Sequence, residues 1–122
     1  MPMTKVVFYK EDDGSVPLID WLSILEPRAV VKCRVKLQRL AELGHELRRP
    51  EADYLRDGIY ELRIVFGSIN YRLLYFYHGQ EAAVVSHGLA KERRVPLREI
   101  SKAVERKQRY ETAPREHRAE MG

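Results

Sequence analysis

The sequence predicts an α+β fold in which an N-terminal strand and an αα-hairpin pack on an antiparallel sheet, with a further helix at the C-terminus. Apolar residues recur at helical spacing in two early segments and one late segment. Between them lie runs rich in β-branched and aromatic residues, joined by short glycine-containing turns. A length of 122 residues suits a single domain, which we assign to residues 1–111, followed by a flexible tail at residues 112–122.

The N-terminal third is expected to form one strand and two helices. β-branched and aromatic residues predict the strand at residues 4–9. Pro17 suits the first turn of a helix, and Pro27 suits both the end of that helix and the start of the next. The second helix runs to about Leu43, because Gly44 is a typical helix stop. The apolar faces comprise Leu18, Trp21, Leu22 and Leu25 in the first helix, and Val30, Cys33, Leu37 and Leu40 in the second.

The remaining segments predict a loop, three strands and a last helix. The loop covers residues 44–58, and its length suggests a functional surface. The last helix begins near Pro96 and ends near Tyr110. The strands, which should form an antiparallel meander, are expected at residues 59–66, 69–78 and 81–87.

The cysteine count and the hydropathy pattern limit the cellular setting. The single cysteine, Cys33, excludes a disulfide within the chain and favours a reducing compartment. Its place on a helical apolar stripe favours buried packing over a nucleophilic role. No run approaches the roughly 18 apolar residues that span a bilayer, and the first residues lack the apolar core of a signal peptide. We therefore expect a cytoplasmic protein that does not associate with a membrane.

The predicted sheet carries a row of polar side chains on one face. Two-residue turns at both strand connections pair Arg63 with Arg72 and Arg72 with His87. Directly paired residues share a face of the sheet, so these three side chains and Glu61 point the same way. The opposite face is continuously apolar, so we expect the helices to cover it and to leave the polar face bare.

This polar row has two interpretations. Two opposed arginines repel one another unless solvent, a carboxylate or a bound anion compensates their charge. Glu61 lies diagonal to Arg72, and a surface salt-bridge cluster is therefore one interpretation. The other is a phosphate-binding face, because the planar guanidinium group of arginine donates two hydrogen bonds at once to a phosphate.

The excess of positive charge lies in the C-terminal half of the chain. The formal net charge is +4; residues 1–61 hold ten Lys and Arg against eleven Asp and Glu, and residues 62–122 hold twelve against seven. A basic half suits a polyanionic partner such as RNA, or simply a solvated surface. Lys91, Arg93 and Arg94 add positive charge beside the polar row. The sequence shows no metal-ligand spacing, glycine-rich nucleotide loop or serine nucleophile motif, so no metal or other cofactor is expected.

Three segments together resemble the phage-derived HigB-like branch of the RelE/ParE toxin superfamily. They are DGIYELRI, INYRLLYFY and AVVSHGLAKERRVPLREISKAVERKQRYE. Within them the family pattern is matched by Glu61-Leu62-Arg63, by Tyr71-Arg72, and by the run from Ser86 to Lys91 that precedes Pro96. The predicted βααβββα order of elements also matches, and the resemblance covers residues 4–110.

The resemblance implies the toxin of a type II toxin–antitoxin system. Such a toxin is a ribosome-dependent, metal-free mRNA endoribonuclease, neutralised by a HigA-like antitoxin with a helix-turn-helix domain. In such enzymes the 2′-hydroxyl attacks the adjacent phosphate, while side chains move protons and stabilise the phosphorane. By position, the catalytic residues would be Arg63, Arg72, His87 and Lys91, with His87 as an acid or base because imidazole titrates near neutrality. The RNA-binding positions, which face the RNA backbone or ribosomal RNA, would be Arg93, Arg94 and Glu61.

The chain departs from the family pattern in three places. Glu61 stands where RelE-type members carry a lysine, and Glu92 replaces the second lysine of a Lys-Lys pair. RelE-type members use a tyrosine early in the last helix. This chain has no tyrosine there, and Tyr110 comes too late in the helix to match it. These departures keep two alternatives open: a non-catalytic or ParE-like toxin that inhibits gyrase, and a degenerate member that only binds RNA.

Overall fold

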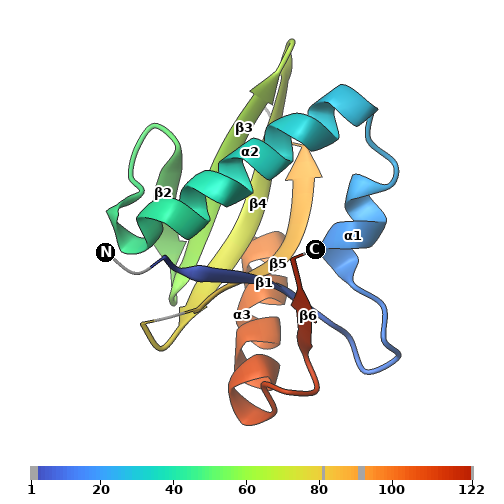
Figure 1. The fold of residues 1–122 in the computed structure, drawn as a ribbon, viewed down its shortest axis with the longest axis vertical. Helices are drawn as coiled ribbons and strands as arrows, with labels where there is room; N and C mark the ends of the chain where they lie inside the picture. Colours follow the sequence, from blue (N-terminus) through green and yellow to red (C-terminus); the bar gives the residue numbers. More distant parts are fainter. Residues whose placement is uncertain (1–2, 81, 91–92, 122) are drawn as a thin grey trace.

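The computed structural model describes residues 3–80, 82–90 and 93–121. Over these residues, six strands form one mixed sheet in the order β2-β3-β4-β5-β1-β6 (Figure 1). The strands are β1 (Lys5–Tyr9), β2 (Ala52–Arg56), β3 (Ile59–Phe66), β4 (Ile69–His78), β5 (Ala82–Ala90) and β6 (Arg118–Glu120). The helices are α1 (Pro17–Leu22), α2 (Pro27–Leu43), the short 3₁₀ helix η1 (Gly44–Glu46) and α3 (Leu97–Thr112). The predicted α+β class is confirmed.

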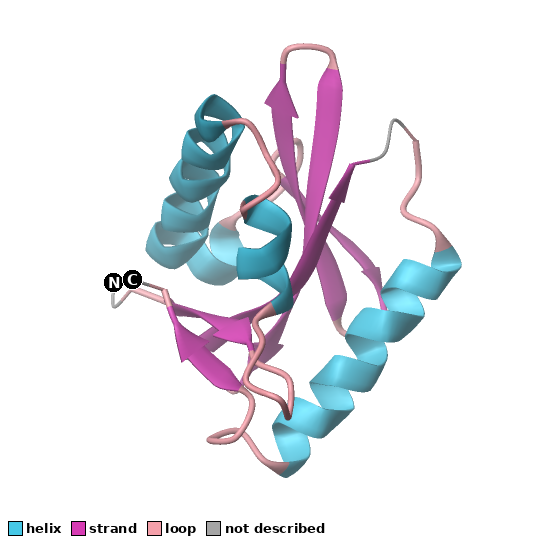
Figure 2. Ribbon diagram, turned by 90° about the vertical axis from the view of Figure 1, so that its right-hand side faces the viewer, coloured by secondary structure: helices cyan, strands magenta, loops and turns pink. Residues whose placement is uncertain are grey.

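Helices cover both faces of the sheet. Figure 2 shows α1 and α2 on one side and α3 on the other. The expectation of a bare polar face is therefore wrong for the part beneath α3. That part is apolar, because Ile59, Leu74, Phe76 and Val84 lie on the same face as the arginines but further along the strands, and on it α3 buries Ile100, Ala103 and Tyr110. None of the helices within the described residues is long and apolar enough to cross a membrane.

The ends and the buried face of α2 follow from its sequence. Pro27 occupies its first turn, where a missing backbone N–H leaves no intrahelical bond unmade. Gly44 follows the helix with a φ of +52°, and a Cβ at this position would collide with the hydroxyl of Thr4, so the stop requires glycine. Cys33 is fully buried on the inner stripe, as predicted, and burial raises the pKa of its thiol to about 11. The thiol therefore stays protonated at neutral pH.

β3 and β4 pair in the predicted register. The Gly67-Ser68 turn joins the strands directly, and Arg63 lies opposite Arg72. The local turn signal was sufficient here because no irregularity interrupts this pair of strands.

β4 and β5 pair differently from the prediction. His78 pairs with Ala82, so the connection holds one residue more than expected, and an irregularity in the middle of the pair shifts the register by one more. Leu89, rather than His87, therefore lies opposite Arg72, and the predicted pairing is wrong. Because the two shifts together move the register by two residues, His87 still points to the same face as Arg72.

The predicted loop at residues 44–58 contains the edge strand β2. Asp57 and Gly58 both have positive φ angles, of 51° and 82°. This is the tight hairpin geometry that an Asp-Gly pair favours. The turn returns the chain antiparallel to β3, with a register irregularity near the end of β2. The loop expectation is therefore wrong for Ala52–Arg56.

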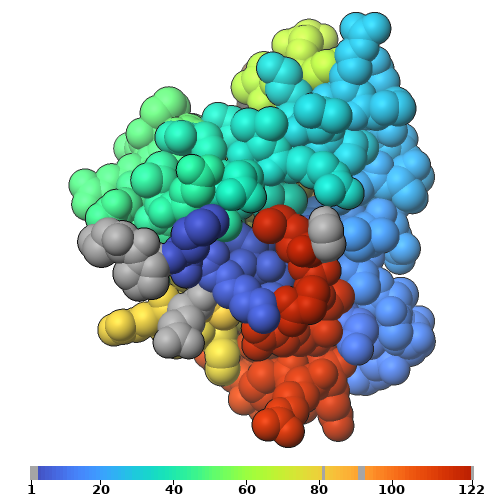
Figure 3. All heavy atoms as spheres, viewed as in Figure 1, coloured from blue at the N-terminus to red at the C-terminus, as the bar shows by residue number. Residues whose placement is uncertain are grey.

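The C-terminal residues also differ from the flexible tail expected at residues 112–122. β6 pairs antiparallel with β1, and Figure 3 shows the C-terminal segment (red) against the N-terminal strand (dark blue). His117, just before β6, is buried, and its ring stacks on Tyr9 with 5.1 Å between centroids. Its Nδ1 donates a hydrogen bond of 2.8 Å to the carbonyl of Lys10. These contacts attach the end of the chain to the sheet.

Candidate functional site

Arg63 and Arg72 lie side by side on the face of the sheet that α3 partly covers. They are a directly opposed pair on β3 and β4, as predicted. Arg72 is the more enclosed, since 13% of its side chain is exposed against 33% for Arg63. The guanidinium groups therefore occupy a half-buried position where a carboxylate or another anion has to compensate their charge.

Two carboxylates compensate this charge. Glu61 is buried and places Oε2 2.5 Å from Nε of Arg63 and 3.5 Å from Nε of Arg72. Asp53 on β2 lies 3.2 Å from Nη2 of Arg63 and 3.1 Å from Nε of Arg49. The Arg49 guanidinium holds the pKa of Asp53 below its usual range. We call this series, in which charges of opposite sign alternate from Arg72 through Glu61, Arg63 and Asp53 to Arg49, the ion-pair chain.

The ion-pair chain borders an open hollow of about 530 Å³, which we call the arginine hollow. Its other side is formed by the connection that leads into α3 and by the start of that helix. The charged residues that line it are Arg56, Arg63, Arg72, Arg93, Arg94, Asp53 and Glu61, which is five cations against two anions. A hollow of this size, with an excess of guanidinium groups, suits a phosphate-bearing ligand.

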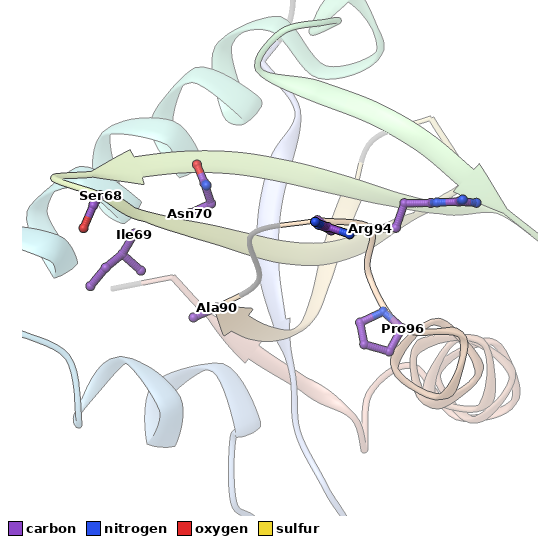
Figure 4. A pocket seen from close by; sticks show the side chains of 7 residues that line it. Ser68, Ile69, Asn70, Ala90, Arg94 and Pro96 are labelled. Carbon is purple, nitrogen blue, oxygen red and sulfur yellow. The ribbon is translucent and has the colours of Figure 1, made fainter.

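A second hollow of about 620 Å³ opens beside the first (Figure 4). Figure 4 shows Ser68 and Ile69 at the β3–β4 turn, with Arg94 and Pro96 across from them on the connection into α3. Arg93 and Arg94 line both hollows. The structure thus brings these two predicted RNA-binding residues close to the Arg63–Arg72 pair.

His87 lies beneath α3. His87 is not among the described residues that line either hollow. Its side chain is only 8% exposed, and both ring nitrogens are bonded, Nε2 to Glu99 Oε1 at 3.0 Å and Nδ1 to Ser86 Oγ at 2.7 Å. The carboxylate can only accept, so Nε2 donates to it and Nδ1 accepts from the hydroxyl. Burial, followed by the charge of Arg106, lowers the pKa of His87 well below its ordinary value.

The contacts of His87 continue into a buried polar chain, made of Arg106, Ser86, His87 and Glu99. Nη1 of Arg106 donates to Ser86 Oγ at 3.3 Å. Burial raises the pKa of Glu99, but Lys102, His87 and Arg98 together bring it below its usual value. Ser86 has no exposed surface, so its hydroxyl is closed to a substrate. The buried polar chain therefore joins β5 to α3.

The other expected groups have different positions. Lys91 and Glu92 lie outside the described residues, so the roles assigned to them stay predictions. Tyr110 is fully buried, with its ring packed against Phe76 and His78. Within residues 3–80, 82–90 and 93–121, no group of three or more His, Cys, Asp or Glu side chains could hold a metal ion.

Sequence reasoning missed Asp53 and Arg49, which both belong to the predicted loop. The Asp57-Gly58 turn signal could have revealed a hairpin there. A two-residue turn alone, however, would pair Asp53 with Leu62 on the other face of the sheet. The irregularity in β2 instead pairs Asp53 with Glu61 and so brings it to the arginines.

Comparison with known proteins identifies the family. Residues 20–108 match the family described as "Phage derived protein Gp49-like (DUF891)". This range contains α2, β2 to β5 and most of α3, and with them the ion-pair chain. A search among curated proteins finds no match. Because the match covers well over half of the sequence, the chain belongs to the phage-derived Gp49-like family, a RelE-like family associated with the toxins of toxin–antitoxin systems.

Proposed function

We propose that this protein is a HigB-like toxin of a type II toxin–antitoxin system and that it cleaves mRNA on the ribosome in the cytoplasm. A HigA-like antitoxin with a helix-turn-helix domain would neutralise it. Family membership supports a toxin with an antitoxin partner. The observation that carries the nuclease proposal is the Arg63–Arg72 pair on the wall of the arginine hollow, with Arg93 and Arg94 opposite. Guanidinium groups placed in this way suit a phosphate whose negative charge rises during the reaction.

In the proposed reaction the nucleophile is the 2′-hydroxyl of the RNA. The scissile phosphate enters the arginine hollow and displaces Glu61 from Arg63 and Arg72. The released carboxylate accepts the 2′-hydroxyl proton as the 2′-oxygen bonds to phosphorus. The bond from phosphorus to the 5′-oxygen then breaks, while both arginines stabilise the phosphorane. Lys91 is our candidate for protonating the leaving 5′-oxygen, and no metal takes part.

His87 has a positioning role in this proposal, in place of the acid or base role that the resemblance implies. Its nitrogens are bonded within the buried polar chain, and its lowered pKa keeps the imidazole neutral at physiological pH. By fixing α3 against β5, His87 holds the connection that carries Arg93 and Arg94. A substitution of His87 should therefore act through the position of that connection.

The experiment that tests the proposal is the substitution Arg72→Lys, which keeps the charge and removes the planar fork. We expect mRNA cleavage in a translating extract to fall by about 10²–10³-fold, the usual loss when one donor to a transition-state anion is removed. Arg28→Lys is a matched control, because the side chain of Arg28 is 84% exposed on α2, and it should cleave like the wild type. Thermal unfolding checks that both variants fold. Wild-type cleavage by folded Arg72→Lys protein would reject Arg72 as a contact to the reacting phosphate.

The carboxylates of the ion-pair chain favour a second candidate, an RNA-binding protein without nuclease activity. Glu61 and Asp53 already compensate the charge of Arg63, and a ligand phosphate has to compete with them. Salt-sensitive RNA binding together with intact mRNA in the extract would identify this second function. Growth arrest with DNA damage signalling and intact mRNA would instead identify a gyrase inhibitor.

A further inference from the structure

A third hollow lies beside the edge strand β2 and has a volume of about 520 Å³. Tyr54, Tyr60, Arg48 and Arg49 are among the residues that line it, and we call it the tyrosine hollow. We propose that the tyrosine hollow binds a base of the same RNA strand whose phosphate occupies the arginine hollow. This inference rests on the proposed function and adds a substrate subsite to it.

Tyr54 provides an aromatic surface that is already held in position. Its exposed fraction is 52%, although it is a large aromatic residue in a strand. Its ring packs edge-on against Tyr60 with 5.0 Å between centroids, and Tyr60 in turn stacks on Tyr75. The backbone N–H of Gly58 donates to the Tyr54 hydroxyl at 3.0 Å. A base that stacks on this ring would therefore lose little free energy to ordering the protein side chain.

The arginines of the tyrosine hollow suit the phosphates on either side of such a base. Arg48 is exposed and forms no ion pair with any described residue. Arg49 lies 3.1 Å from Asp53, at the end of the ion-pair chain. An aromatic surface beside cationic side chains is the general arrangement of sites for single-stranded nucleic acid, in which bases stack and arginines follow the backbone.

The two hollows are physically connected. Asp53 and Tyr54 line both of them. The ion-pair chain runs from Arg49 in the tyrosine hollow to Arg72 in the arginine hollow. β2 is the edge strand of the sheet, so an RNA strand can pass around it from one face to the other. One strand can therefore place a phosphate at Arg63 and a neighbouring base at Tyr54.

The test measures the binding of a randomised RNA by fluorescence anisotropy at low salt. The probe has about 12 nucleotides, within the usual range of site sizes, and is 2′-O-methylated so that the 2′-oxygen cannot attack. Tyr54→Ala should weaken binding by roughly 5- to 150-fold, the range expected for one stacked base. Tyr54→Phe keeps the ring and loses only the hydrogen bond from Gly58, so it should restore most of the binding that Tyr54→Ala loses. Val35→Ala, at an exposed apolar position on α2, is the matched control and should also bind like the wild type.

A second variant, Arg48→Glu, guards against the chance that Tyr54→Ala does not fold. It reverses an exposed charge and should weaken binding, because single-stranded RNA is held partly through its phosphates. If Tyr54→Ala folds, its undiminished binding would overturn the inference. If Tyr54→Ala does not fold, undiminished binding by Arg48→Glu would overturn it. A wild-type protein that does not bind the probe would overturn it as well.

The cleavage assay distinguishes this inference from the proposed function. If Tyr54→Ala binds normally while Arg72→Lys loses cleavage, the base site is rejected and the nuclease proposal stands. If Tyr54→Ala loses binding while Arg72→Lys cleaves like the wild type, the base site stands and the catalytic assignment is rejected.

Discussion

Glu61 contacts both Arg63 and Arg72 and so determines the charge of the candidate site before a ligand binds. Its carboxylate allows two arginines to lie opposite one another without strong repulsion. A phosphate of the substrate would take the place of the Glu61 carboxylate beside the two arginines, so one anion would replace another. The glutamate at this position, which is the departure from the RelE-type lysine, thus has a structural explanation in this chain.

His87 should make the stability of the fold depend on pH. Burial and then Arg106 lower its pKa from the ordinary value of 6.5 in the folded protein, whereas unfolding restores that value. The unfolded state therefore binds the proton more tightly, and the free energy of unfolding falls as the pH drops from 6.5 towards the lowered pKa. Urea titrations at a pH of about 7.5 and of about 5 should show this loss of stability.

His87→Gln serves as the control for this prediction. The variant should be less stable than the wild type at neutral pH, because it disturbs buried hydrogen bonds to Ser86 and Glu99. Its stability should also change less between the two pH values. An equally steep change in the variant would assign the effect to another titrating group.

Among the elements, β6 depends on a residue outside its own span. The buried ring of His117 stacks on Tyr9, and its Nδ1 donates to the carbonyl of Lys10. His117→Ala removes both contacts and should lower the free energy of unfolding by about 1–3 kcal/mol in urea denaturation. Arg115→Ala, at an exposed position, should change it by less than about 0.5 kcal/mol. Equal stability of the His117 variant and the wild type would mean that His117 does not anchor β6.

Elements with strong local signals could be predicted, and elements that depend on partners could not. α2 is bounded by Pro27 and Gly44, and the Gly67-Ser68 turn sets the β3–β4 register. β2 and β6 are short, and much of their stability comes from pairing with β3 and β1. The irregularity between β4 and β5 lies beside Gly88, and a glycine in a strand is typical of such an irregularity. It was missed because the predicted strand ended at residue 87, before this glycine.

At the scale of the whole molecule, the sequence predicted which residues share a face but not which part of that face is covered. Pairing on adjacent strands brought Arg63, Arg72 and Glu61 together. Where α3 crosses the sheet depends on long-range packing, and that packing leaves the arginines beside a hollow while it covers His87. This is why the adjacency of Arg63, Arg72 and Glu61 could be predicted from spacing, whereas the burial of His87 beneath α3 could not.

The uneven charge of the molecule gives a further prediction for RNA binding. Affinity should fall with salt with a logarithmic slope of about −0.7 for each phosphate contacted. The double variant Arg93→Ala/Arg94→Ala removes two cations of the arginine hollow and should make this slope shallower by roughly 1.4. Arg28→Ala, on α2, should leave the slope unchanged. A wild-type slope in the double variant would show that these arginines do not contact phosphates.

β1 lies inside the sheet, between β5 and β6, although it precedes both of these strands in the chain. Lys5 pairs with Ala82, and Val7 pairs with Glu120. Both neighbouring strands follow β1 in the chain, after α1, α2 and the strands β2 to β4, so the nascent protein cannot close its sheet early. A protein proposed to attack translating ribosomes would therefore complete its sheet only after β6 has left the ribosome that made it.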